Sequence, residues 1–340
     1  MPETLKIIRT DSKLECPQLD AALRERGQLV LLPDGVGENE LLLQVHDADL
    51  VLMCYTPITA RIIAGAARLK GIVKYGVGID AIDIEAAKAR KIPVVNVPAY
   101  AEETVAEGAF ALMIALAKKL RPLQKAMDKT GWVWPANEWL ASDLSGKTLG
   151  LVGMGRIGCS MARMGALGFN MRVLAVSPST SAEEVQAAGA EKREDLRAML
   201  AECDFVSVHA VLNPETHGLI GPRELSAMKR SAYLINTARG AIVDEVALVA
   251  ALQKNEIAGA ALDVFSQEPL AKAGHPLSDL FGMDNVILSP HLTFFTHDAM
   301  VRLEEDTLAR CDELLSGNPV LIKSADPRLT SQTHGVTFAQ

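Results

Sequence analysis

The sequence predicts an α/β protein made of two doubly wound domains, each with a parallel sheet. Short apolar runs of strand length alternate with helical segments over residues 5–97, and the same alternation returns from residue 147 onward. A long apolar helix over residues 101–120 separates the two series. The 340 residues, of which 49% are hydrophobic, are enough to bury two cores.

The elements are expected in this order along the chain. The first series has strands near Ile7, Val30, Val51, Ile72 and Val94 and a helix over residues 83–90. The second series has strands near Leu149, Val173, Val206, Leu234, Ala260 and Val286. A final helix is expected over residues 298–315.

A glycine-rich turn opens the second series. The sequence predicts a buried strand over residues 147–152 and a helix over residues 156–167, and Gly153, Gly155 and Gly158 have the spacing GxGxxG. The first glycine permits a tight turn, the second lets a pyrophosphate approach the backbone, and the third lets the helix pack on the strand. Because a second strand follows at residues 171–176, the context favours a dinucleotide site over a glycine-rich turn of another doubly wound protein.

The end of that second strand departs from the usual NAD pattern. An Asp or Glu normally binds the ribose hydroxyls there, and this chain has Ser177. Without a carboxylate nothing at this position repels a 2′-phosphate, but Pro178 stands where a phosphate-binding Arg would be useful. The nearest basic residues downstream, Lys192 and Arg193, are a helix away in sequence. We therefore expect NAD as the cofactor, with NADP as the alternative.

Three polar residues, Arg239, Glu268 and His291, each follow closely on an apolar run of strand length. The carboxyl ends of parallel strands are where open sheets collect their active sites. Arg matches a carboxylate with two hydrogen bonds, and a His beside a carboxylate keeps a proton available near neutrality. Each residue alone has a plainer interpretation: a satisfied core histidine, a salt-bridge arginine or a solvated turn glutamate. Their joint placement favours acid/base chemistry on a carbonyl.

At this point the chain resembles the D-isomer-specific 2-hydroxyacid dehydrogenases over nearly its full length. The matching stretches include residues 74–116, LVGMGRIG (151–158), LINTARGAIVDEVALVAALQ (234–253), GAALDVFSQEPL (259–270) and NVILSPHL (285–292). The resemblance implies that Arg239, Glu268 and His291 are catalytic. Arg239 would bind the substrate carboxylate and polarise the keto oxygen, and His291, paired with Glu268, would transfer the proton.

The resemblance also implies cofactor and substrate contacts. Arg156 and Ile157 would contact the pyrophosphate, and His209 and Pro214 would contact the adenosine side. Thr104, Thr237 and Ala238 would contact the nicotinamide half, and Asp263 would bind the carboxamide. Backbone N–H groups of Val77 and Gly78 would bind the substrate carboxylate, because the glycines that bound this loop let its main chain come close to the substrate. Tyr55 could line the same cleft or only cover the surface.

The domain boundaries follow from the same resemblance. Residues 1–100 and 295–325 would form a flavodoxin-like substrate domain, and residues 101–294 a Rossmann cofactor domain, with a cleft between the two. Residues 326–340 would be a tail that is loose or covers a neighbouring subunit. A homodimer through the region of residues 101–120 is the family-based expectation.

Two aromatic groups leave alternatives open. Trp132, Trp134 and Trp139 could form a pocket wall or subunit contact, or a packed loop at the domain junction. Phe294 and Phe295 follow the candidate histidine, where we expect them to narrow the cleft or line it with apolar surface.

Composition excludes several classes of function. A net charge of −8 and a pI near 5.5 argue against nucleic acid or an anionic membrane as partner. Five cysteines without ligand spacing predict neither a metal site nor a disulfide framework. The charged start lacks an apolar signal region, so we expect a cytoplasmic protein.

The sequence thus predicts an NAD(P)-dependent 2-ketoacid reductase acting on a small 2-keto or 2-hydroxy acid. A site like that of formate dehydrogenase would lack a glutamate at position 268, so the presence of Glu268 disfavours it. A site like that of phosphite dehydrogenase would have lysine where this chain has Val77, so it is disfavoured too. The alternative from another class is an NAD(H)-sensing scaffold, like the corepressor relatives of the family. The absence of a basic or low-complexity recruitment extension disfavours it.

Overall fold

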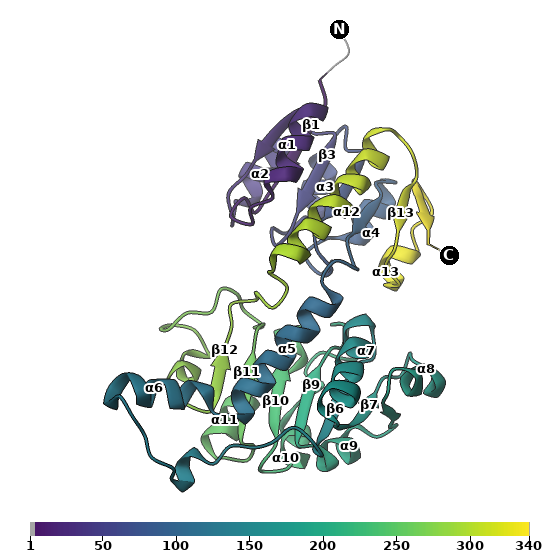
Figure 1. Cartoon of the computed structure of the whole chain (residues 1–340). Helices are drawn as coiled ribbons and strands as arrows, with labels where there is room; N and C mark the ends of the chain where they lie inside the picture. The colour runs from purple at the N-terminus through teal and green to yellow at the C-terminus, as the bar shows by residue number, and fades with distance from the viewer. Residues whose placement is uncertain (1–3, 340) are drawn as a thin grey trace. The chain divides into compact units, whose positions relative to one another are not determined.

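Residues 4–339 are described by the computed structural model, and they fall into two compact units (Figure 1). The first unit combines the chain up to Ala101 with the chain from Thr296 onward, and the second unit is Glu102–Phe295. Both are built from parallel sheets and helices, so the predicted α/β fold class is confirmed.

The first unit contains a five-stranded sheet in the order β2-β1-β3-β4-β5. Its strands are β1 Lys6–Arg9, β2 Gln28–Leu31, β3 Leu50–Met53, β4 Gly71–Lys74 and β5 Val94–Asn96, all parallel. Its helices are α1 Pro17–Arg26, α2 Glu38–Val45, α3 Ala60–Gly65, α4 Ile84–Ala89 and α12 His297–Leu315. Every residue of β3 and β4 is buried, as expected for central strands covered on both faces. The strand order is that of flavodoxin-like folds.

The end of the chain is ordered and packed rather than loose as far as residue 339. Strand β13 Val320–Ile322 pairs in parallel with β14 Val336–Phe338, and α13 Pro327–Thr330 lies between them in sequence. Gln332 is only 4% exposed, and its side-chain amide donates to the carbonyl of Val94 and accepts from the N–H of Val94. The polar sequence concealed this packing because a buried glutamine satisfied by backbone groups resembles a surface residue in composition.

The second unit contains a seven-stranded parallel sheet in the order β12-β11-β10-β9-β6-β7-β8, the doubly wound order of Rossmann folds with one further strand. Its strands are β6 Thr148–Val152, β7 Arg172–Val176, β8 Glu191–Lys192, β9 Phe205–Val208, β10 Tyr233–Asn236, β11 Gly259–Leu262 and β12 Val286–Leu288. Its α-helices are α5 Glu102–Ala117, α6 Leu120–Thr130, α7 Arg156–Arg163, α8 Ala182–Ala187, α9 Leu196–Glu202, α10 Pro222–Ala227 and α11 Glu245–Gln253. Helix α7 continues as a π-helical turn, Met164–Gly168, and short 3₁₀ turns occupy Asn137–Trp139, Gly240–Ile242 and Ser278–Gly282.

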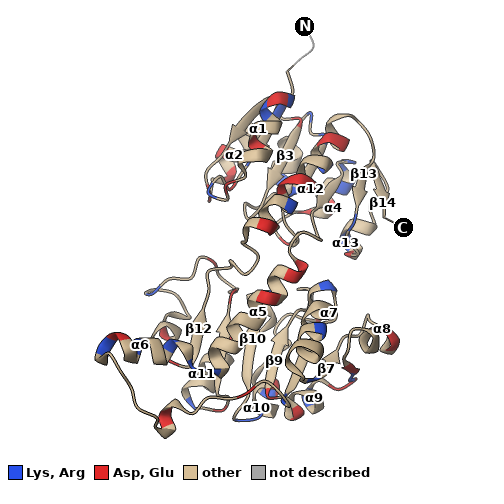
Figure 2. Ribbon diagram, in the orientation of Figure 1, with Lys and Arg blue, Asp and Glu red and all other residues tan. Residues whose placement is uncertain are grey.

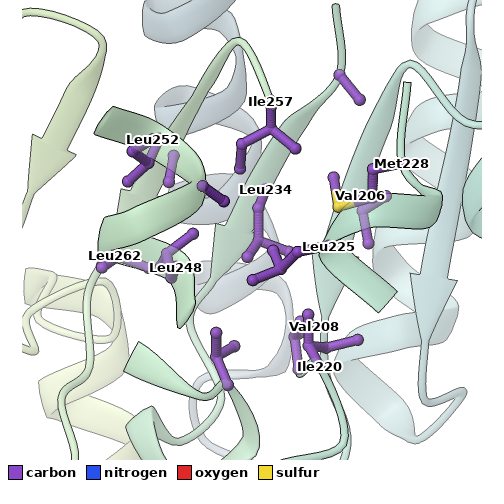
Figure 3. Packing of buried hydrophobic residues seen from close by; sticks show 14 of the residues in the cluster. Val206, Val208, Ile220, Leu225, Met228, Leu234, Leu248, Leu252, Ile257 and Leu262 are labelled. Carbon is purple, nitrogen blue, oxygen red and sulfur yellow. The ribbon is translucent and has the colours of Figure 1, made fainter. Parts of the chain in front are cut away.

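The sheet of the second unit separates two apolar cores, because successive residues of a strand point to opposite faces. Val206, Leu234 and Leu262 contribute to one core with Leu248 of α11, as Figure 3 shows. Phe205 and Tyr233, the neighbours of Val206 and Leu234 in sequence, contribute to the other, which α5 covers. Both faces of this sheet are therefore covered by apolar side chains, and the polar groups that could bind a ligand lie at the strand ends and in the loops.

Charged residues of both signs lie along the helices of both units (Figure 2). In the second unit, acidic Glu102 and Glu103 begin α5 and form ion pairs with Arg156 and Arg163 of α7. Among residues 4–339, no helix combines the length and the apolar character needed to cross a membrane.

The tryptophan segment is exposed. Trp132 and Trp134 are 63% and 78% exposed and make an edge-to-face contact with each other. Helix α6, which precedes them, has no buried residue. The interpretation as a packed loop is therefore disfavoured, and the interpretation as a contact surface is kept.

Candidate active site

The turn after β6 has the geometry that a phosphate site needs. Gly153 adopts a φ of +100°, which side chains rarely tolerate, and α7 begins three residues later. A Cβ on Gly158 would lie 2.3 Å from the carbonyl oxygen of Gly153, so this position must be glycine for the helix to approach the strand. A Cβ on Gly155 would meet nothing within 4 Å, so the open side of the turn lies at this residue.

A polar atom at the end of β10 fits a bound dinucleotide. The side-chain oxygen Oγ1 of Thr237 is buried and has no hydrogen-bond partner among the described residues. A buried hydroxyl without a partner costs on the order of 1–3 kcal/mol, which a ligand group can recover. The next residue, Ala238, donates its N–H to the side-chain oxygen of Asn236, which fixes the backbone at this strand end. The residues present therefore fit a nicotinamide dinucleotide.

Arg239 leaves β10 directly beside the loop that carries Glu268. A Cβ on Gly240 would lie 2.0 Å from the carbonyl carbon of Phe265, so only glycine permits this approach of the two loops. The N–H of Ser266 donates to Glu245 of α11, which anchors the second loop. The Arg239 guanidinium donates to the carbonyl of Ala238, and its charge acts on Glu268.

Glu268 and His291 form a hydrogen-bonded pair. Nδ1 of His291 lies 2.9 Å from Oε2 of Glu268, and Oε1 of Glu268 accepts the N–H of Phe265. Burial acts to raise the pKa of Glu268, but the hydrogen bond and charge of His291, with lesser contributions from Phe265 and Arg239, hold it below its ordinary value. Glu268 is thus ionised at neutral pH, which sets the orientation of the ring and favours a proton on Nδ1. The three candidate residues of separate strands are brought together in one unit.

The loop that carries His291 is held by a buried carboxylate. Asp263, fully buried after β11, accepts the N–H of Leu292 on Oδ1 and both the N–H and the hydroxyl of Thr293 on Oδ2. His291 itself has a φ of +59°, a conformation that a histidine adopts only when its surroundings impose it. The sequence analysis expected Asp263 to bind the carboxamide and did not predict that it holds the loop after β12.

A comparison with known proteins identifies the family. The model for "D-isomer specific 2-hydroxyacid dehydrogenase, NAD binding domain" matches residues 110–293. The chain belongs to this family. The chain is 40% identical over 279 residues to a glyoxylate reductase of Thermococcus litoralis, a match that covers 80% of this chain and 82% of the relative. It is therefore an oxidoreductase of 2-hydroxy acids with a domain for a nicotinamide cofactor.

Solved structures agree with this assignment. A D-lactate dehydrogenase from Aquifex aeolicus, complexed with NAD and lactic acid, is 32% identical and superposes with a TM-score of 0.82, covering 92% of this chain and 96% of that one. An acyclic imino acid reductase in complex with NADPH and D-Arg is 28% identical, with a TM-score of 0.83 and coverage of 93% and 99%. The same fold thus carries either dinucleotide.

The other residues that we expected to contact the cofactor differ from one another in burial and hydrogen bonding. His209, after β9, is hydrogen-bonded through Nε2 to Ser207, and burial lowers its pKa to about 4, so its ring is neutral. Pro214 lies exposed in a turn closed by hydrogen bonds between Asn213 and Thr216. Thr104 is buried on α5, and Ile157 is half-buried on α7.

A cation of β8, distant in sequence, contacts the loop after β7. Ser177 is buried, and its hydroxyl lies 2.9 Å from Oγ1 of Thr180. Nζ of Lys192 donates to the carbonyl oxygen of Thr180 at 2.9 Å. Helix α8 turns back along the edge of the sheet, so β8 pairs with β7 and returns Lys192 to the strand end. Only the two-residue length of β8 hid this arrangement from the sequence pattern.

The two phenylalanines after His291 do not behave alike. Phe294 is 8% exposed and packs edge-to-face against the His291 ring at 6.4 Å, whereas Phe295 is 47% exposed. Phe294 thus packs against the candidate acid/base ring, whereas Phe295 has the more exposed side chain.

In the first unit, the loops at the carboxyl ends of β3 and β4 contain the expected substrate residues. Tyr55 and Val77 are 44% and 41% exposed, and Gly78 is half-buried. Asp11 accepts the N–H groups of Cys54, Tyr55 and Thr56, and so fixes the first loop. Asn96 donates to the carbonyl of Val77, which fixes the second.

Proposed function

We propose that the chain is a 2-ketoacid reductase, equally a D-2-hydroxyacid dehydrogenase, in which Arg239 binds the carboxylate and carbonyl and the His291–Glu268 pair is the acid/base catalyst. The 2.9 Å contact between His291 and Glu268, under the charge of Arg239, carries the proposal. A glyoxylate reductase and a D-lactate dehydrogenase are among the proteins most like it, which supports a short 2-keto acid as substrate.

The roles follow from the position of each group. When bound, the dinucleotide supplies the hydride for reduction or accepts it for oxidation. Glu268 binds Nδ1 of His291, so Nε2 is the atom that gives its proton to the keto oxygen in reduction and takes it back in oxidation. Arg239 offers the substrate carboxylate two parallel hydrogen bonds and polarises the adjacent carbonyl. The negative charge that develops on the keto oxygen is then stabilised by the Arg239 cation and by the proton of His291.

The residues that would hold the cofactor belong to the second unit, at its strand ends and in the first turns of α5 and α7. They are Gly153, Gly155, Arg156, Ile157, Gly158 and Ser177, with His209 and Pro214 on the adenosine side and Thr104, Thr237, Ala238 and Asp263 on the nicotinamide side. Because both carboxylate oxygens of Asp263 already accept hydrogen bonds, a carboxamide would have to share them. In the first unit, we propose that the N–H groups of Val77 and Gly78 bind a carboxylate and that the exposed ring of Tyr55 contacts substrate.

We also propose that the exposed apolar surface of α6, Trp132 and Trp134 joins two copies of the chain. Leu120, Met127 and Leu140 extend this surface with exposures of 53%, 38% and 69%. Sedimentation of the wild type and of Trp134→Ser at matched concentrations tests this: a dimer that the variant weakens supports the surface, and a monomeric wild type contradicts it.

The proposed activity is tested by oxidation of NADH and NADPH with a panel of 2-keto acids from glyoxylate to phenylpyruvate. His291→Asn is the sharpest variant, because asparagine tolerates the left-handed backbone of this position while removing the acid. We expect kcat to fall by at least about 10²-fold with dinucleotide binding unchanged. Dinucleotide binding without turnover on any acid would contradict the proposal and favour a sensing scaffold.

A further inference from the structure

We infer that Lys192 binds the 2′-phosphate of NADPH and that this dehydrogenase prefers NADPH to NADH. The inference rests on the proposed function, since it concerns the adenosine end of the same dinucleotide. It differs from the sequence-based expectation of NAD, which rests on Pro178 in place of a phosphate-binding Arg and on the distance of Lys192 from Ser177 along the chain.

The position of Lys192 is set by the sheet. Strand β8 pairs with β7 in the register Ala175 to Lys192, so the lysine stands at the edge of β7 just before that strand ends. The loop 177–180 begins there, at the place where Rossmann folds bind the adenosine ribose. The hydrogen bond from Nζ of Lys192 to the carbonyl of Thr180 at 2.9 Å fixes the ammonium group beside this loop.

The loop lacks the group that would exclude a phosphate. A carboxylate after β7 would bind both ribose hydroxyls and repel a 2′-phosphate, and Ser177 offers a hydroxyl instead. Helix α8 begins with two acidic residues, Glu183 and Glu184, and Glu184 accepts the N–H of Ser181 and caps its own helix. Hydroxyls of Ser177 and Thr180 bond each other and are able to rotate toward a phosphate oxygen.

The ammonium group has capacity for a phosphate. It carries three donors, of which Thr180 takes one. Its carboxylate neighbour, Glu194, lies 3.8 Å away with a side chain that is 86% exposed, so the pair is loose and screened by solvent. The Lys192 side chain is only 19% exposed, which leaves its own charge less screened toward a bound ligand.

The adjacent cation provides a matched control. Arg193 directs its guanidinium to Glu191 at 3.1 Å and to Glu202 at 3.5 Å, and no described contact joins it to the loop 177–180. Arg193→Gln therefore removes the same unit of charge one residue away. Any effect of net charge alone would appear equally in both variants.

The test is equilibrium binding of NADPH and NADH, in the absence of substrate, to the wild type, Lys192→Met, Lys192→Arg and Arg193→Gln. Methionine retains the apolar stem while removing the charge. We expect the wild type to bind NADPH more tightly, and Lys192→Met to weaken NADPH about tenfold while changing NADH less than about twofold. Arginine should restore the preference, and Arg193→Gln should leave it intact.

A second measurement does not depend on any variant. Adenosine 2′,5′-bisphosphate should displace NADPH from the wild type at lower concentration than 5′-AMP, and added salt should reduce that advantage. Equal displacement by the two nucleotides overturns the inference, as does an equal loss of NADPH and NADH affinity in Lys192→Met. If the wild type binds neither dinucleotide, the proposed function fails together with the inference. NADH binding without a phosphate preference overturns the inference alone.

Discussion

Asp11 in the first unit and Asp263 in the second use the same structural device for different ends. Each aspartate directly follows or closely follows a strand, is buried, and accepts N–H groups of the loop after the neighbouring strand. Asp11 follows β1 and holds the loop after β3, and Asp263 follows β11 and holds the loop after β12. Parallel strands place their carboxyl ends at one edge, so a carboxylate there reaches the next loop.

The difference lies in what each loop carries. The loop held by Asp11 presents Tyr55, the proposed substrate contact, whereas the loop held by Asp263 contains His291, the proposed acid/base residue. The same hydrogen bonds should therefore contribute mainly to folding stability and substrate affinity in the first unit and mainly to turnover in the second. Substitutions at the two aspartates and their partners test this contrast.

Asp263→Asn should have the largest effect, and that effect should be on turnover. The NH₂ group of the asparagine would face an N–H group that now donates to the carboxylate. Because two donors cannot bond each other, the backbone next to His291 would be displaced. Because a misplacement of about 1 Å can cost about 10²-fold, we expect kcat to fall by this factor while KM for the keto acid changes less. A shifted pH profile of kcat would accompany the loss, since the pairing of His291 with Glu268 would loosen. Unchanged kcat in a folded variant would break the comparison.

Asp11→Ala should reduce stability instead. Three backbone N–H groups and the hydroxyls of Thr10 and Thr56 lose their acceptor, and we expect a loss of about 3 kcal/mol in the free energy of unfolding of the first unit. Thermal unfolding followed by circular dichroism measures the loss. At a temperature where the variant is folded, kcat should remain within about threefold of the wild type. A collapse of kcat without loss of stability would show that the two aspartates are not different.

Acid pH sharpens the stability half of the contrast. Burial acts to raise the pKa of Asp11, but hydrogen bonds from Thr10, Cys54, Tyr55 and Thr56 hold it below its ordinary value. Its ionised form therefore stabilises the fold above the unfolded value of about 4, and this contribution disappears as the pH falls through the lower folded value. The stability difference between wild type and Asp11→Asn should be constant near neutrality and shrink below about pH 4. A difference that grows on acidification would contradict the assignment.

The smallest effects are expected from a matched pair of hydroxyl deletions. The hydroxyl of Thr56 donates to Asp11 at 2.8 Å and that of Thr293 to Asp263 at 2.6 Å. Thr56→Val and Thr293→Val should each cost about 1 kcal/mol of stability. Only Thr293→Val should also lower kcat, by a few-fold. Equal kinetic effects of the two variants would remove the distinction between the loops.

The sequence predicted the larger elements well because their signals are local. Apolar runs gave the positions of the central strands, and the glycine spacing gave the turn before α7. Arg239, Glu268 and His291 could be proposed as partners because each follows a strand of one parallel sheet. The 2.9 Å pair of Glu268 with His291 agrees with that proposal.

What the sequence concealed depends on contacts between distant segments. Lys192 lies 15 residues after Ser177 in the chain, and only the pairing of β8 with β7 reveals their proximity. Asp263 resembles any aspartate after a strand until the N–H groups of residues 292 and 293 are seen to converge on it. Phe294 and Phe295 are identical in sequence terms, and burial alone separates them.

Gln332 has a consequence for the solubility of shortened chains. Strand β5 is the last strand of its sheet, and the amide of Gln332 occupies the N–H and the carbonyl of Val94 as another strand would. An exposed strand edge is a template on which a second polypeptide can add by backbone pairing. A chain that stopped before this glutamine would leave the N–H and the carbonyl of Val94 unpaired at the start of β5. We therefore expect the side chain of Gln332 to protect the edge of β5 from pairing with a second copy of the chain.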